Sequence, residues 1–185
     1  MTELEAYAKF IDYLKSHLIN YHEDIDERGI KRISMVYTDY PNCPNKAIES
    51  CVYFHKECIE CKVYYTQLGS NICKKSLYRA DLYRLLNYIN ANIWPCVCDF
   101  ASGKFYQPAY LYTPRIILTE DGYFDITATT LIPYDFYELA PLQTEDYMTA
   151  CIPDLMHKLS PIIFSLLGAN IKIDDAIKYI SETFE

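Results

Sequence analysis

The chain has 185 residues, of which 51% are apolar and 23% are charged, and its formal net charge is −8. This length and apolar content predict one folded domain over residues 1–185 and exclude a disordered chain. No apolar run approaches the roughly 18 residues of a membrane span. The acidic start is unlike a signal peptide, so we expect a cytoplasmic protein.

The first half of the chain is predicted to contain two helices that flank three strands. Thr2 and Glu5 match a capping box, and the apolar residues that follow recur at steps of three and four. Later segments alternate between apolar and polar residues, which is typical of half-buried strands. The expected elements are a helix over 2–18, a polar stretch over 20–29 that ends this helix, a strand from Ile30 to Pro41, two strands within Cys51–Tyr65, a break at Gly69–Asn71 and a helix over Leu77–Asn92.

The second half is predicted to be rich in strands and then helical. Glu120-Asp121-Gly122 lies between two apolar runs and predicts a hairpin turn. Thr144 and Ser160-Pro161 have the chemistry of helix N-termini, and Gly168 has that of a helix end. The expected elements are a strand over Cys96–Phe100, extended chain over Tyr110–Leu118, a strand from Tyr123 to Ile132, helices after Thr144 and Ser160, and a last helix over Asp174–Thr183.

This order of elements predicts the α+β class. Strands joined by tight turns pair antiparallel, and the chain lacks the regular alternation of strands and helices that builds a parallel sheet. We therefore expect an antiparallel sheet with helices packed on it, in the order α-βββ-α-ββ(β)-αα.

The charge is divided unevenly along the chain. Residues 1–104 carry 13 basic and 13 acidic side chains, whereas residues 105–185 carry 4 basic and 12 acidic ones. The acidic second half repels phosphate groups, so neither nucleic acid nor a membrane surface is expected as a partner. A basic segment of another polypeptide fits this charge better. The alternative is a solvated face that only keeps the protein soluble.

The eight cysteines include one pair with metal-site spacing. Cys58 and Cys61 form a CxxC sequence, and His55 stands three residues before it. Zinc needs four ligands that converge on one point, but residues an odd number apart on a strand point to opposite faces. No metal and no other cofactor is therefore predicted. The alternative zinc ligands are His55, Cys58 and Cys61, and otherwise the cysteines are expected to be reduced, packed thiols.

Side chains that could carry catalysis are scattered. No GxSxG motif is present, and the four histidines stand in unrelated surroundings. Asp24, Asp26 and Gly29 occupy the first, third and sixth positions of an EF-hand loop, but Arg28 and Met35 stand where further calcium ligands are required. No catalytic residue is assigned, and the protein is not expected to be an enzyme.

The 19 tyrosines are the most distinctive part of the composition. Tyrosine offers a large contact area and a hydroxyl group at low entropic cost, which suits a binding surface. The alternative is packing between neighbouring strands. The candidate aromatic surface consists of Tyr106, Tyr110, Tyr112, Tyr134, Phe136 and Tyr137.

The order of elements and the acidity resemble the type III secretion chaperone-like superfamily. These are small α+β domains with a helix, three strands, a second helix, further strands and a final helix. The matching stretches are the helix over Thr2–Leu18, the strands within Ile30–Tyr65, the helix over Leu77–Asn92, the strands within Cys96–Ile132 and the helices after Thr144. No residue motif is shared, so no site residue is carried over. The resemblance implies a bacterial, cytoplasmic, often homodimeric protein that binds other polypeptides.

Two hypotheses about function follow. The first is a non-enzymatic protein-interaction module, chaperone-like or regulatory, that forms a homodimer and binds another polypeptide. The second is a small-molecule binder or an enzyme that uses the aromatic and acidic block around Tyr110–Tyr137.

Overall fold

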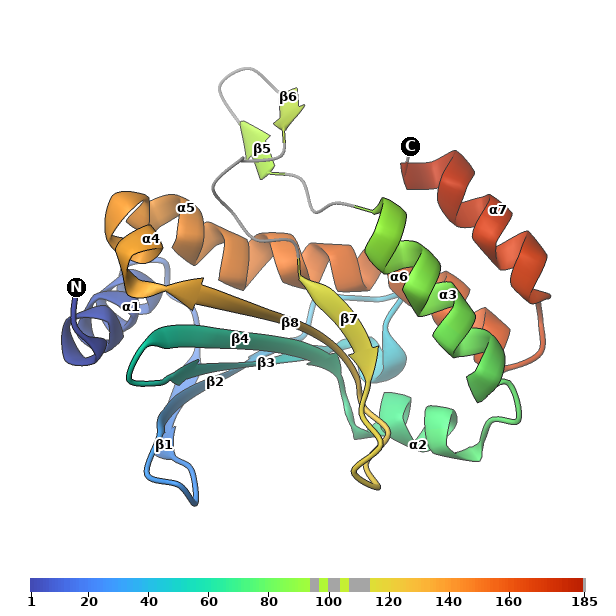
Figure 1. The fold of residues 1–185 in the computed structure, drawn as a ribbon, viewed down its shortest axis with the longest axis horizontal. Helices are drawn as coiled ribbons and strands as arrows, with labels where there is room; N and C mark the ends of the chain where they lie inside the picture. The colour runs from blue at the N-terminus through green and yellow to red at the C-terminus, as the bar shows by residue number, and fades with distance from the viewer. Residues whose placement is uncertain (94–96, 100–103, 107–113, 185) are drawn as a thin grey trace.

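A computed structural model describes residues 1–93, 97–99, 104–106 and 114–184 of the chain (Figure 1). Its strands are β1 (Tyr21–Ile25), β2 (Lys31–Tyr37), β3 (Ile48–Phe54), β4 (Cys58–Tyr65), β5 (Val97–Asp99), β6 (Lys104–Tyr106), β7 (Arg115–Leu118) and β8 (Ile126–Pro133). Its helices are α1 (Glu3–Ser16), η1 (Pro44–Lys46), α2 (Gln67–Lys75), α3 (Arg79–Asn92), α4 (Tyr134–Leu139), α5 (Pro141–Asp146), η2 (Tyr147–Cys151), α6 (Ile152–Leu167) and α7 (Ile173–Phe184). Six strands form one antiparallel sheet in the order β1-β2-β3-β4-β8-β7, and β5 pairs with β6. The predicted α+β class is confirmed.

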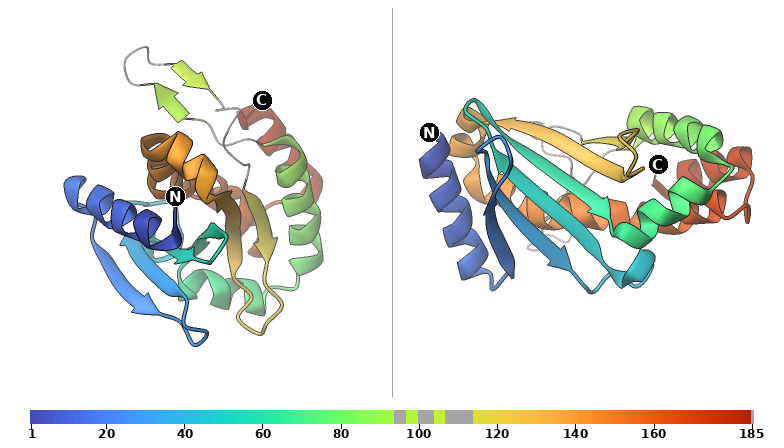
Figure 2. Two further views of the ribbon diagram at one scale, coloured as in Figure 1. Left: turned by 60° about the vertical axis from the view of Figure 1, so that its left-hand side comes forward. Right: turned by 90° about the horizontal axis from the view of Figure 1, so that it is seen from below.

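One face of the six-stranded sheet packs against helices (Figures 1 and 2). Along β4 every second side chain from Ile59 to Tyr65 is buried, as the alternation in the sequence predicts. The ring of Phe10 in α1 lies 6.1 Å from that of Phe54 in β3, and Tyr65 meets Phe164 of α6 edge to face at 4.9 Å between ring centroids. Each fully buried side chain of this size stabilises the fold by about 2–3 kcal/mol.

The β7–β8 hairpin completes the sheet from a distant part of the sequence. Its second strand, β8, pairs with β4, although α2, α3, β5 and β6 lie between them along the chain. The predicted turn is confirmed: Gly122 has a φ of +95°, a conformation that glycine adopts without strain.

A side chain of α3 caps part of the outer edge of β7. The amide nitrogen of Asn90 donates to the carbonyl of Ile116 at 2.8 Å, and the backbone N–H of Ile116 donates to the Asn90 amide oxygen at 2.8 Å. Asn90 thus takes the hydrogen bonds that a further strand would make. An unpaired edge invites another chain to pair with it, and the two Asn90 hydrogen bonds block such pairing at Ile116 of β7.

We expect Asn90→Ala to lower the free energy of unfolding by about 1 kcal/mol, because two hydrogen bonds to the β7 backbone are lost. Urea unfolding followed by circular dichroism measures this change. Asn92→Ala is the control, since the Asn92 amide donates to the Tyr88 carbonyl of its own helix, at 2.9 Å, and bonds no other described residue. Equal effects of the two substitutions would show that the hydrogen bonds between Asn90 and Ile116 do not stabilise the fold.

Two predictions in the first half are wrong. The structure places β1 within the polar stretch over 20–29, because an edge strand with exposed His22 and Glu23 shows no apolar alternation. Gly69–Asn71 lies inside α2 and does not break the chain, because Gly69 allows that helix to pack closely on β4. The strand β3 also begins at Ile48, three residues before the predicted start.

Thr144 and Ser160 are not the helix N-caps that the sequence predicts. α5 begins three residues before Thr144, whose hydroxyl donates to the Ala140 carbonyl at 2.7 Å. Ser160 lies inside α6, is fully buried, and donates to the Asn42 carbonyl at 2.8 Å. Both hydroxyls donate hydrogen bonds to backbone carbonyl groups. Local sequence does not distinguish this role from that of an N-cap, in which the hydroxyl accepts from a backbone N–H. The predicted helix end at Gly168 is confirmed.

One helical run is long and apolar enough to cross a membrane by length and composition. It extends over Pro141–Leu167, and 56% of its most apolar window is buried inside the fold. No membrane span is predicted from the apolar runs of the sequence. Core helices have the same composition, and α6 packs on the sheet here, so this run by itself does not indicate a membrane protein.

Candidate functional site

The face of the sheet opposite α1 and α6 is the candidate site. Its side chains include three exposed apolar residues, namely Val36, Ile117 and Leu131, which are 58%, 42% and 56% exposed. Figure 2 (right) looks onto this face, with the strands lying in front of α6. We call it the open face.

The register of the strands arranges the open face in three rows across the sheet. The first row is Asp24, Arg32, Tyr53, Glu60 and Leu131, the second is His22, Ser34, Cys51, Lys62, Thr129 and Arg115, and the third is Val36, Glu49, Tyr64, Thr127 and Ile117. Cations, carboxylates, aromatic rings and aliphatic groups are therefore neighbours on one surface. Such a surface can contact both the apolar and the charged side chains of a ligand.

Tyr53 lies between two cations of the open face. The Lys62 ammonium group is 5.2 Å from the centre of the Tyr53 ring, and the Arg32 guanidinium carbon is 5.9 Å from it. The His55 ring is nearly parallel to the Tyr53 ring, at 17° and 6.2 Å. Cation–π contacts at such half-exposed positions are worth about 0.5–1 kcal/mol each and hold the long side chains in place.

Tyr64 anchors the third row. Its hydroxyl lies 3.2 Å from the Cys51 thiol, which lies 3.4 Å from the Ser34 hydroxyl. Burial raises the pKa of the Tyr64 phenol well above its usual value. Tyr64 therefore stays protonated at neutral pH and acts as a hydrogen-bonding group.

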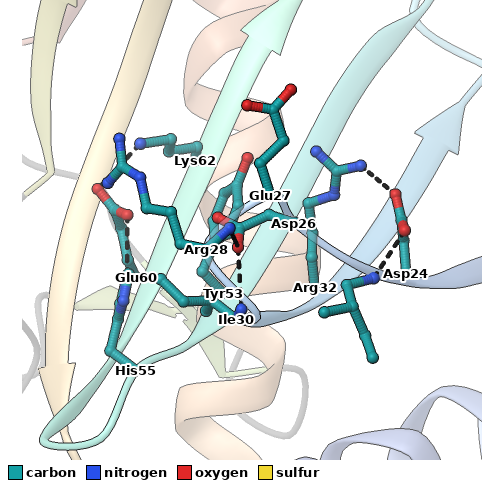
Figure 3. A pocket seen from close by; sticks show the side chains of 11 residues that line it. Asp24, Asp26, Glu27, Arg28, Ile30, Arg32, Tyr53, His55, Glu60 and Lys62 are labelled. Atoms are coloured by element: carbon teal, nitrogen blue, oxygen red, sulfur yellow. Dashed lines mark hydrogen bonds and ion pairs between the residues drawn. The ribbon is translucent and has the colours of Figure 1, made fainter.

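A pocket of about 450 Å³ lies over the first row, beside the turn of the β1–β2 hairpin (Figure 3). The hairpin is shaped by Asp26, whose carboxylate accepts the backbone N–H groups of Arg28 and Ile30, each at 2.9 Å. We call it the hairpin pocket. Its lining residues are Asp24, Ile25, Asp26, Glu27, Arg28, Ile30, Arg32, Tyr53, His55, Glu60 and Lys62.

Most carboxylates of the hairpin pocket are committed to partners within the protein. Asp24 accepts from Arg32 and from the backbone N–H of Ile25, and the Arg32 bond holds the pKa of the Asp24 carboxyl below its usual value. One oxygen of Glu60 lies 3.1 Å from the His55 ring nitrogen, and the other lies 3.1 Å from the Lys62 ammonium group. These acids organise the cations of the pocket.

The alternative zinc ligands do not converge. Cys61 is fully buried on the helix face, and burial raises the pKa of its thiol to about 12. Cys58 lies on the opposite face of β4, as the odd spacing predicts, and His55 pairs with Glu60. In the described ranges, no group of three or more His, Cys, Asp or Glu side chains is placed to hold a metal ion.

The residues of the candidate aromatic surface lie in different places. Tyr134 and Tyr137 are buried, at 6% and 0% exposure, and Phe136 packs against the core. All three belong to α4, which directly follows β8. Tyr106 belongs to β6, and Tyr110 and Tyr112 fall outside the described residues. The three aromatic side chains of α4 therefore pack in or against the hydrophobic core.

The open face is not among the sites predicted from the sequence. The alternation of apolar and polar residues along β4 puts Glu60 and Lys62 opposite its buried side chains, but alternation alone gives these two residues no role. A signal is present in the printed sequence: the outward positions of β2, β3 and β4 carry Arg32, Tyr53 and Tyr64 in addition to that pair. Large and charged groups at consecutive outward positions indicate a surface that can bind a ligand.

Comparison with protein-family models, with curated proteins and with solved structures finds no match to this chain.

Proposed function

We propose that this protein is a non-enzymatic interaction module that binds an extended segment of another polypeptide across the open face. The observation that carries the proposal is the composition of that face, where exposed Val36 and Leu131 lie among half-exposed aromatic and charged side chains. An exposed apolar group on a folded protein gains free energy when a partner covers it.

The charge of the open face also favours a polypeptide. The face carries Arg32, Lys62 and Arg115 beside Asp24, Glu49 and Glu60, so neither a polyanion nor a polycation complements it. A polypeptide segment of mixed sequence presents both charges and apolar groups. The acidic excess of residues 105–185 lies largely on α4 to α7, where a basic segment would be attracted.

The resemblance to the type III secretion chaperone-like superfamily supports the same class of function. That resemblance rests on a helix, three strands, a second helix, further strands and final helices, whereas the structure has four strands and two α-helices between α1 and β5. It also implies a cytoplasmic homodimer, and both properties belong to the proposal.

The test is binding of a polypeptide that cannot fold. We expect reduced, alkylated and fluorescently labelled α-lactalbumin to bind saturably, as measured by fluorescence anisotropy. Val36→Lys with Leu131→Lys should weaken this binding about fivefold or more, because charged groups then replace the apolar contacts. Light scattering of the same protein reports whether its mass is twice 21.6 kDa.

Leu77→Lys is the matched control. Leu77 is 94% exposed and lies between α2 and α3, away from the open face. All three positions are exposed, so the substitutions should leave the fold intact, and thermal unfolding checks this. Equal weakening by the control and the open-face variant, or no binding by the unmodified protein, would contradict the proposal.

The second hypothesis, a small-molecule binder, finds support in a different place from the predicted block. The hairpin pocket, at about 450 Å³, lies within the range of about 300–1,000 Å³ of ligand pockets. A thermal-shift screen with small metabolites would detect such a ligand as a rise in melting temperature.

A further inference from the structure

The hairpin pocket has unused hydrogen-bond donors. Lys62 meets one carboxylate, that of Glu60, and its side chain remains 37% exposed. The guanidinium group of Arg28 makes no hydrogen bond or ion pair with the described residues, and Figure 3 shows its side chain extending over the pocket. The Nε–H of Arg32 is buried without an acceptor.

The acceptors, in contrast, are largely occupied. Both oxygens of Asp24 and both oxygens of Glu60 already accept from groups of the protein, and Asp26 accepts from two backbone amides. Glu27 is exposed at the hairpin tip. An incoming group that complements the pocket must therefore bring acceptors rather than donors.

The carboxylates of the pocket disfavour an anion that carries more than one negative charge. Three cations, Arg28, Arg32 and Lys62, lie among four carboxylates, so a phosphate dianion would meet strong repulsion from the acids. A carboxylate carries one charge and two acceptor oxygens in a plane. It can accept from an arginine and a lysine at the same time.

We infer that the hairpin pocket binds an aspartate or glutamate side chain of the polypeptide that lies on the open face, through Arg28 and Lys62. Arg32 adds positive charge to the pocket while Asp24 holds it in place. The inference rests on the proposed function, because Tyr53 and Glu60 of the first row of the open face also line the pocket.

The experiment compares two blocked octapeptides of serine and threonine that differ only in a central glutamate or glutamine. Binding to the full chain is measured from amide chemical shifts during titration. The glutamate peptide should bind about 5- to 10-fold more tightly, and 0.5 M salt should reduce this ratio. Arg28→Gln with Lys62→Gln should abolish the preference. Lys56→Gln, at an exposed position outside the pocket lining, should retain it.

The outcomes separate this inference from the proposed function. Equal binding of the two peptides, or a preference that survives the double substitution, overturns the carboxylate site and leaves polypeptide binding intact. If neither peptide binds, titration with glutarate tests the pocket alone. Saturable shifts at Arg28 would then assign the site to a free dicarboxylate and overturn the polypeptide occupant, and the absence of shifts would overturn the site altogether.

Discussion

Gly69→Ala is expected to lower the free energy of unfolding by about 2 kcal/mol, although alanine normally stabilises a helix relative to glycine. A Cβ atom at this position of α2 would lie 2.7 Å from the Cβ of Tyr65 and 3.2 Å from the Phe164 ring. Tyr65 cannot move away from the added methyl group, because its side chain is buried and its hydroxyl donates to the Met156 carbonyl at 2.7 Å. The overpacking penalty of about 1–3 kcal/mol therefore exceeds the gain in helix propensity.

Thermal unfolding checks this result, and a loss of about 2 kcal/mol corresponds to roughly 4–8 °C in a chain of this size. Asn71→Ala is the control, since Asn71 is exposed on the same helix and the same new residue should there raise stability by a few tenths of a kcal/mol. A rise in stability for both variants would show that α2 does not pack on β4 as described.

The second large effect is expected at a buried tyrosine–carboxylate pair. The hydroxyl of Tyr137 in α4 donates to the carboxylate of Glu145 in α5, and these side chains are 0% and 4% exposed. Tyr137→Phe removes the donor and leaves a buried carboxylate without this hydrogen bond. We expect the free energy of unfolding to fall by about 2–3 kcal/mol at pH 7.5.

The loss should depend on pH in a defined direction. Burial raises the pKa of Glu145 above its usual 4.5, while the Tyr137 hydrogen bond opposes that rise. The folded state therefore binds a proton more readily than the unfolded state, and stability falls as pH rises from about 4.5 through the folded pKa. Tyr137→Phe raises the folded pKa further. The difference between the two proteins should thus be largest above that pKa and shrink under acidic conditions, where both hold a neutral carboxyl group.

Urea unfolding between pH 4 and pH 8 measures this dependence. Tyr83→Phe is the matched control, because Tyr83 donates to the carboxylate of Glu120 in the same way but is 41% exposed, and its loss should cost less than about 0.5 kcal/mol. Adding Glu145→Gln to Tyr137→Phe should recover part of the stability at pH 7.5, since the buried charge is removed. A pH-independent loss would contradict a carboxylate-based mechanism.

The candidate site could be predicted only in part. Alternation along β4 correctly places Glu60 and Lys62 on one face, and the odd spacing of Cys58 and Cys61 correctly places these two thiols on opposite faces of the strand. Arg28 lines the same pocket as residues of β3 and β4 because the strand register brings these positions together. They lie far apart in the sequence, so local patterns do not show that they are neighbours. The predicted aromatic surface wrongly includes the α4 aromatics, because composition does not show whether a ring is buried.

The α+β class, the capped first helix, the β4 alternation and the β7–β8 turn can be predicted from local sequence, because each depends on neighbours within a few residues. Long-range packing is needed to pair β8 with β4, to place polar β1 at the edge of the sheet and to hold Gly69 within a helix. Those outcomes depend on which distant surfaces can be buried together. The open face and the hairpin pocket arise from the same long-range packing.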